Sequence, residues 1–175
     1  MKSLTAKSIL IITFVAIAFL TGCAGGTSTE SVTGAGSGSV EAPSRSGRDV
    51  SALKCGDVLS KSFVVSLGIP DSEYYSEESS MPCVFADVTF VFWTGDQFAT
   101  LLQGAQMLPD PSNIKETSSV GSRTMEYEGS YLGHTVEVGF VTKNKNATAL
   151  VTFTGDTATL NLAKKIAQEM EKNLQ

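Results

Sequence analysis

Few side chains in this sequence have the types and spacing that covalent or acid–base catalysis needs. Ser51 with Lys54, and Ser112 with Lys115, match the Ser-x-x-Lys spacing of penicillin-recognising enzymes, but the Ser-Asp-Asn and Lys-Thr-Gly partners of those enzymes are absent. His134 is the only histidine, and no Gly-x-Ser-x-Gly accompanies it, so we expect a turn or surface histidine rather than a triad base. The sequence therefore predicts no catalytic residue, no metal ligand and no cofactor.

A polar loop between the second and third cysteines is rich in carboxylates and contains two adjacent tyrosines. Its carboxylate spacing lacks the Asp-x-Asp-x-Asp-Gly pattern and closing Glu of a calcium loop. A solvated loop and a partner-binding loop both remain open, because tyrosine supplies a large contact area at low entropic cost. The carboxylates are Asp71, Glu73, Glu77 and Glu78, and the candidate partner-binding residues are Tyr74, Tyr75, Tyr127 and Tyr131, the last two from a second predicted turn.

Cys55 and Cys83 are expected to form a structural disulfide. A protein exported from the cytoplasm usually oxidises such a pair, and the chain offers only His134 as a further zinc ligand of the usual N/S type. Closing a loop of about 29 residues would stabilise the fold by roughly 3–4 kcal/mol in the loop-entropy description. Two free thiols remain the alternative.

Cys23 is the residue with the most specific expected chemistry. It follows Leu20-Thr21-Gly22 at the end of the mainly apolar run from Ile9 to Leu20, which itself follows a basic start. Basic, apolar and small residues in that order predict a secretory signal peptide over residues 1–22. The run would span only about 18 Å as a helix, too short to cross a bilayer. Leu20 to Cys23 resembles the lipobox of bacterial lipoproteins, which implies cleavage after Gly22 and lipidation of Cys23. A cleaved signal without a lipid is the alternative.

Residues 23–48 are expected to form a flexible tether, because they are rich in Gly, Ser, Thr and Ala and have almost no large apolar side chain. Without residues 1–22, which include Lys2 and Lys7, the 13 basic side chains become 11 against 18 acidic ones, a net charge near −7. This acidic balance argues against nucleic-acid binding. It also argues against adsorption on anionic lipids beyond the acyl anchor.

Residues 49–175 are expected to form one α+β domain, an antiparallel sheet of about four strands packed with helices. Strands are predicted over 83–93, 123–127, 136–140 and 149–153 from β-branched, aromatic and alternating apolar residues. Asp57 is expected to cap a first helix that Gly68 ends, and Asp96 a second one. Gly155-Asp156 is expected to open a terminal helix. Its apolar stripe comprises Leu160, Ala163, Ile166, Ala167, Met170 and Leu174.

The chain resembles a family of actinobacterial surface lipoproteins built on a domain of unknown function. The resemblance rests on the lipobox, on Cys55 followed by a helix that ends in Leu67-Gly68, and on a second cysteine, Cys83, that opens a strand. That family often has Cys-x-Trp at the second cysteine, where this chain has Cys83-Val84-Phe85. The resemblance covers the lipobox and about residues 50–95, and implies no particular activity.

These patterns together predict a lipoprotein that Cys23 anchors in the cell membrane, on its extracytoplasmic face. A binding or envelope-accessory role is expected, with an envelope protein or a small ligand as partner, and not an enzyme. An enzyme or enzyme subunit that acts on the cell envelope is the alternative. A scaffold without a small ligand is a third class.

Overall fold

The computed structural model describes residues 49–72, 75–78, 80–131 and 133–175. Within these residues the chain forms one α+β domain with a single open sheet of six strands. The predicted signal peptide and tether, including Cys23, lie outside the described residues. In chain order the elements are η2 (Val50–Ala52), α2 (Cys55–Val58), α3 (Lys61–Ser66), β1 (Cys83–Phe85), β2 (Val88–Thr94), α4 (Phe98–Ala105), η3 (Pro111–Asn113), β3 (Lys115–Thr117), β4 (Arg123–Gly129), β5 (Thr135–Val141), β6 (Ala147–Thr154) and α5 (Leu160–Leu174).

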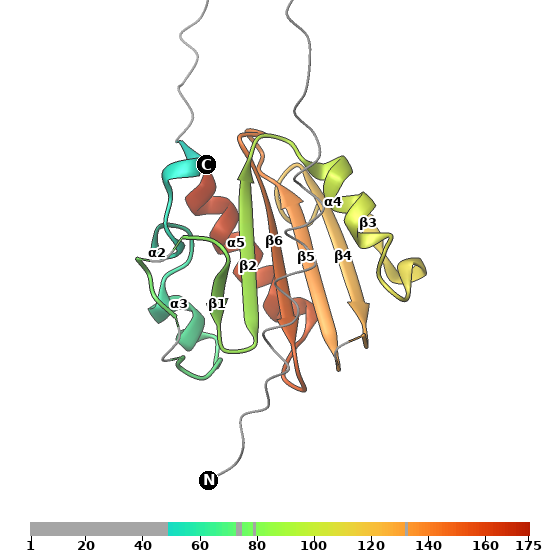
Figure 1. The fold of residues 1–175 in the computed structure, drawn as a ribbon, viewed down its shortest axis with the longest axis horizontal. Coiled ribbons are helices and arrows are strands. Elements are labelled where there is room, and N and C mark those ends of the chain that lie inside the picture. Colours follow the sequence, from blue (N-terminus) through green and yellow to red (C-terminus); the bar gives the residue numbers. More distant parts are fainter. Residues whose placement is uncertain (1–48, 73–74, 79, 132) are drawn as a thin grey trace, which may run out of the picture. The chain divides into compact units, whose positions relative to one another are not determined.

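The sheet has the strand order β1-β2-β6-β5-β4-β3, and every neighbouring pair is antiparallel (Figure 1). The prediction of about four strands is wrong for two reasons. The predicted strand over 83–93 is a hairpin, because the chain turns at Ala86, whose φ is 49°, and at Asp87. Strand β3 was missed because all three of its side chains are exposed, so it has no apolar alternation.

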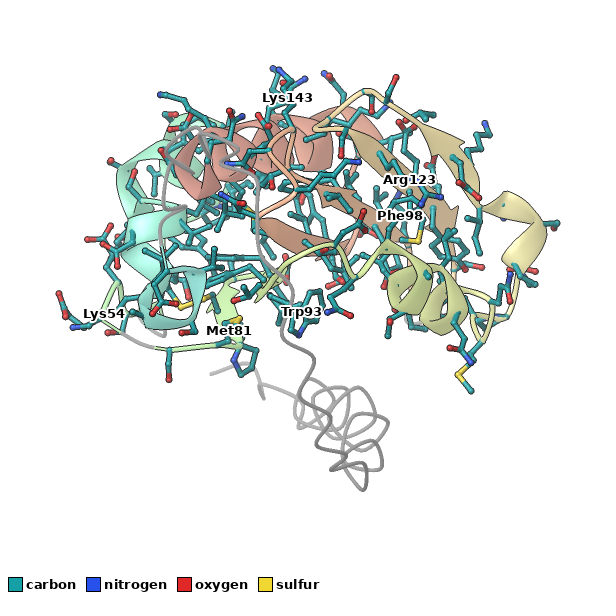
Figure 2. All side chains as sticks on the ribbon, turned by 90° about the horizontal axis from the view of Figure 1, so that it is seen from above. Lys54, Met81, Trp93, Phe98, Arg123 and Lys143 are labelled. Atoms are coloured by element: carbon teal, nitrogen blue, oxygen red, sulfur yellow. A yellow bond between two sulfur atoms is a disulfide. The ribbon has the colours of Figure 1, made fainter. Side chains whose placement is uncertain are left out.

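One face of the sheet, which we call the inner face, carries α5 and the main core. Alternate residues of β5 and β6 point to it and are fully buried, as the sequence predicted. The stripe of α5 packs on them, and α2 and α3 belong to the same core. Figure 2 shows α5 and α4 on opposite sides of the sheet. The inner-face residues are Val136, Val138 and Phe140 on β5 and Ala149, Val151 and Phe153 on β6.

The opposite, outer face carries α4 over β4, β5 and part of β6. Leu101 of this helix lies directly over Gly139, where an added Cβ would stand 2.5 Å from a Leu101 methyl. The helix buries Phe98 and Ala105, and Arg123 stacks on the Phe98 ring at 4.0 Å from its centroid. The N-cap of α4 is Gln97 and not Asp96 as predicted, although the Asp96 carboxylate, one residue earlier, accepts a 3.1 Å hydrogen bond from the Phe98 amide.

The first predicted helix is two short helices instead of one. Leu59 adopts an extended backbone, with φ of −147°, and Ser60 begins α3 by accepting a hydrogen bond from the Phe63 amide. Asp57 belongs to α2, where its carboxylate accepts from the Lys54 amide at 2.9 Å. Gly68 follows the end of α3 with φ of 84°, in agreement with the predicted stop.

The last predicted helix begins later than expected. Thr159, not Gly155-Asp156, caps α5, and its hydroxyl accepts from the Leu162 amide. No helix in the described part of the chain is both long and apolar enough to cross a bilayer.

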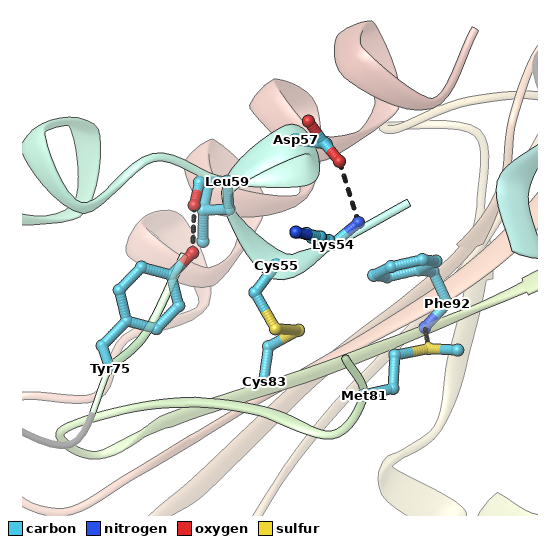
Figure 3. Close-up of a disulfide and its surroundings, with 8 residues drawn as sticks. All are labelled: Lys54, Cys55, Asp57, Leu59, Tyr75, Met81, Cys83 and Phe92. Atoms are coloured by element: carbon cyan, nitrogen blue, oxygen red, sulfur yellow. Dashed lines mark hydrogen bonds between the residues drawn. A yellow bond between two sulfur atoms is a disulfide. The ribbon is translucent and has the colours of Figure 1, made fainter. Parts of the chain in front are cut away.

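The disulfide between Cys55 and Cys83 is confirmed, with the two Cα atoms 5.7 Å apart. It joins the first residue of α2 to the first residue of β1, as Figure 3 shows. Both cysteines are at most 1% exposed. The bridge therefore fastens the small helices to the edge of the sheet from within the core.

Candidate functional site

A carboxylate, two tyrosines and a threonine meet on the outer face beside α4. Tyr127, Glu137 and Thr152 stand opposite one another on β4, β5 and β6. Tyr131, from the connection between β4 and β5, reaches back over them, and its hydroxyl donates a 2.9 Å hydrogen bond to Oε1 of Glu137. The Thr152 hydroxyl donates to the same oxygen at 3.4 Å. We call these four residues the outer-face cluster.

Glu137 is the titratable centre of this cluster. It is 7% exposed, and among the described residues it forms no ion pair. Burial raises the pKa of its carboxyl above the usual value, and the hydrogen bonds from Tyr131 and Thr152 offset this only in part. Both described donors use Oε1, so Oε2 has no hydrogen-bond partner in the described part of the chain.

The Tyr127 hydroxyl is a second buried polar atom in this cluster. The residue is 1% exposed, and its hydroxyl forms no hydrogen bond of good geometry with the described residues, although the Asp110 backbone lies near it. Burial, and then the charges of Asp110 and Glu137, raise its pKa. The hydroxyl lies against Gly129, where an added Cβ would stand 2.0 Å from the oxygen. Glycine is therefore needed at position 129, because any larger residue would clash with the Tyr127 hydroxyl.

The outer-face cluster lies towards the end of the sheet that is far from residue 49. Figure 1 shows the start of the described chain and its C-terminus at one end, and the β4–β5 hairpin, the β1–β2 turn and the β6–α5 connection at the other. We call the second end the distal end. Backbone hydrogen bonds join its loops, from Gly155 to the His134 carbonyl at 2.9 Å and from Thr154 to the Asp87 carbonyl at 3.0 Å. Tyr131 therefore lies among loops that backbone hydrogen bonds connect to one another.

His134 lies at this end, in the turn position that the sequence predicted. Its Nε2 is 3.4 Å from a Glu128 carboxylate oxygen, and no serine hydroxyl among the described residues hydrogen-bonds to it. The two Ser-x-x-Lys matches do not bring a lysine to a serine. Ser51 donates to Asp49, and Lys54 pairs with Glu78.

The described carboxylates of the acidic loop are exposed, as a solvated loop predicts, and they also contact the small helices. Lys61 pairs with Asp71 at 2.8 Å, and its backbone amide donates to Glu77 at 2.8 Å. With Glu78 on Lys54, each of the three described carboxylates of the loop has a partner, and two of them share Lys61. Glu73 lies outside the described residues. Within the described part of the chain no three His, Cys, Asp or Glu side chains form a metal-binding group.

The four tyrosines predicted to bind a partner differ in position. Tyr75 is a core residue, 7% exposed, with its hydroxyl donating to the Leu59 carbonyl and its ring 5.1 Å from that of Phe85. The expectation that Tyr75 and Tyr127 offer exposed contact area is therefore wrong, because apolar packing takes up both rings. Tyr131 is partly exposed, and Tyr74 lies outside the described residues.

Glu137 and Thr152 were not identified from the sequence. Both stand at alternate positions of strands whose other positions are apolar, which is the pattern of an exposed outer face. Glu137 is buried in the fold, and Tyr131, which the β4–β5 hairpin brings back over the sheet, is one of the residues that contact it. One feature of the sequence could have indicated this contact: Tyr131 precedes Glu137 by six residues, and Gly133 lies in the turn between them.

A shallow groove runs along α3, away from the outer-face cluster. It has a volume of about 640 Å³ and is lined by Lys61, Ser62, Val65, Ser66 and Glu77. Lys61 and Glu77 already have partners there, so the groove offers no converging set of free polar groups.

No protein-family model, curated protein or solved structure matched this chain.

Proposed function

We propose that this protein is a lipid-anchored extracytoplasmic binding module, attached to the membrane through Cys23, that presents its distal end to a partner. The lipobox pattern and the Gly/Ser-rich residues 23–48 support the anchor and the tether. A tether of this length and composition spans about 25–30 Å on average. The described domain begins at the end of the sheet opposite the distal loops, so the proposed tether would not join the domain at those loops.

The hydrogen bond between Tyr131 and Glu137 is the observation that carries the binding role. A loop that is already held in place loses less conformational entropy when it binds, so more of the contact energy appears as affinity. Tyr131 is held by a buried carboxyl while part of its ring remains accessible. Tyrosine in such a setting is a typical contact residue.

Site-specific photocrosslinking in intact cells of the native host tests this proposal. A photoreactive residue at Ser130, exposed at the distal end, should give a discrete crosslinked product. The same residue at Lys143, exposed in the turn at the other end of the sheet, should not. Tyr131→Ala should reduce the Ser130 product at least about fivefold, the effect of a contact of about 1 kcal/mol. Equal products at both positions, or a product that Tyr131→Ala does not change, would overturn the proposal.

An enzyme or enzyme subunit acting on the cell envelope is the second candidate, and the raised pKa of Glu137 is the observation that favours it. Buried carboxyls with such pKa values serve as general acids in hydrolases. The two candidates differ in their response to Glu137→Gln. Loss of hydrolysis of an envelope substrate with crosslinking retained would support the enzyme, whereas a binding module would show no hydrolysis to lose.

A further inference from the structure

A methionine sulfur takes the place of a backbone acceptor beside the disulfide. In the β1–β2 ladder Cys83 pairs with Phe90, so residue 81 would be the next to face Phe92 in the same pattern. Instead of a carbonyl, the Met81 thioether sulfur accepts the Phe92 N–H, at an N···S distance of 3.1 Å. Figure 3 shows this contact next to the Cys55–Cys83 bridge.

The four described methionines differ in exposure and bonding. Met81 is 39% exposed and Met107 is 85% exposed, whereas Met125 and Met170 are at most 1% exposed. The Met107 sulfur accepts no hydrogen bond from the described residues. Figure 2 shows Met81 on the same side of the sheet as α4, away from the core around α5. Met81 is therefore the methionine that is both accessible to a solute and hydrogen-bonded to the fold.

We propose that Met81 is a site of peroxide oxidation, and that its sulfoxide fastens the segment before β1 more tightly to β2. Sulfur donates an electron pair to one oxygen of hydrogen peroxide, so an S–O bond forms and the O–O bond breaks. The proton of the transferred oxygen passes to the departing hydroxide, which leaves as water. Sulfur is oxidised by two electrons and peroxide is reduced by two.

The contact between the Met81 sulfur and the Phe92 N–H determines which lone pair the oxidant meets and which group the product can bind. A thioether sulfur has two lone pairs, and the single Phe92 N–H engages one of them, which leaves the other for the oxidant. Thioether sulfur is a weak acceptor, whereas the sulfoxide oxygen is a strong one. The flexible, partly exposed side chain can withdraw far enough to place that oxygen on the same N–H. Reduction by a methionine sulfoxide reductase would restore the original contact.

Peroxide treatment of the full-length protein in detergent tests the proposal. The readouts are peptide mass spectrometry for each sulfoxide and hydrogen exchange at the Phe92 amide. Met81 and Met107 should both gain one oxygen while Met125 and Met170 remain reduced. Hydrogen exchange at the Phe92 amide should slow about fivefold, which corresponds to a hydrogen bond that is stronger by about 1 kcal/mol.

Matched variants separate the two accessible methionines. Met107→Leu should keep the peroxide effect on Phe92, and Met81→Leu should abolish it. A Met81 that stays reduced when Met107 is fully oxidised would overturn the proposal. So would a Phe92 amide that exchanges at the same rate or faster once Met81 carries its oxygen. None of these results depends on the proposed binding role, because Phe92 and Met81 lie outside the outer-face cluster.

Discussion

Glu126 and Glu137 lie on neighbouring strands and on opposite faces of the sheet, and in the part of the chain that the structure describes only Glu126 pairs with a cation. Both are nearly buried, at 5% and 7% exposed. Lys164 of α5 places its ammonium group 2.8 Å from Oε2 of Glu126, while Thr117 and Ser119 donate to Oε1. Burial raises the pKa of Glu126, but Lys164 and the two hydroxyls outweigh it, so this pKa lies below the usual value and that of Glu137 above it. We therefore expect the ionisation of these two carboxyls to change the stability of the fold in opposite directions as pH rises.

We expect Lys164→Met to lower the free energy of unfolding by about 1–3 kcal/mol at neutral pH, because it leaves the Glu126 carboxylate without its cation. Since the folded-state pKa of Glu126 is lowered, its stabilisation is present above the unfolded-state pKa and is lost as pH falls through the folded-state value. The deficit of the variant should accordingly shrink in acid. Urea unfolding at several pH values measures this. Lys165→Met, at an exposed neighbouring position, is the control, and an equal loss in both variants would contradict the role of the pair.

We expect Glu137→Gln to gain stability relative to the wild type as pH rises. The folded-state pKa of Glu137 lies above the unfolded value, so the protonated side chain contributes fully below the unfolded-state pKa. That contribution is lost as pH rises through the folded-state pKa. A glutamine keeps the shape and does not ionise. Thermal unfolding of both proteins across the pH range above 4.5, the ordinary value for Glu, checks the prediction. A pH-independent difference would show that Glu137 has an unshifted pKa.

Replacement of Cys55 and Cys83 by serine should lower the free energy of unfolding by about 3–4 kcal/mol, the loop-closure value for a bridge of this span. The native bridge should also resist mild reductants, because both cysteines are buried. Mass spectrometry of the non-reduced protein, followed by urea unfolding, tests both points. Two alkylatable thiols in protein taken from the native envelope would contradict the assignment.

Gly121→Ala should destabilise the fold far more than Gly133→Ala. Both glycines have positive φ, 65° and 88°, so each substitution costs about 1–2 kcal/mol of backbone strain. At Gly121 the added Cβ would also stand 2.0 Å from the Val141 carbonyl oxygen, whereas at Gly133 it meets open space. Urea unfolding of the two variants provides the comparison. Equal losses would mean that the chain around Gly121 can move away from β5.

Cys23→Ala should release the protein from the membrane or stall its processing, because the acceptor of the lipid is gone. Fractionation of cells that express the variant, with mass spectrometry of the processed N-terminus, measures the outcome. A fully processed variant that stays in the membrane fraction would refute the lipoprotein assignment. Ser28→Ala, in the tether, is a control that should leave anchoring unchanged.

Local patterns were enough to predict the elements whose side chains repeat with a clear period. The stripe of α5 and the alternating residues of β5 and β6 were predicted because one face of each must be apolar to bury against the other. The disulfide was also predicted, since cysteine number and expected compartment left few alternatives. Short elements were not predicted, because they have no repeating apolar face. The exposed strand β3 pairs with β4 through a backbone ladder and two polar side-chain contacts, Thr117 to Glu126 and Glu116 to Arg123, and none of these produces an apolar period in the sequence.

The roles of individual polar residues depended on contacts between distant parts of the chain. Tyr75 and Tyr131 both follow polar, turn-like segments, yet one fills the core and the other covers Glu137. Glu126 and Glu137 have the same chemistry in sequence, and only the packing of α5 against the inner face gives Glu126 its lysine. The sequence by itself determined the class of fold and the pairing of the cysteines, because these follow from composition and local period, and export through residues 1–22 stays a prediction. The tertiary structure decided which carboxyl lies beside a lysine, which tyrosine is accessible and which methionine bonds to the sheet, because burial and pairing are set by residues far apart along the chain.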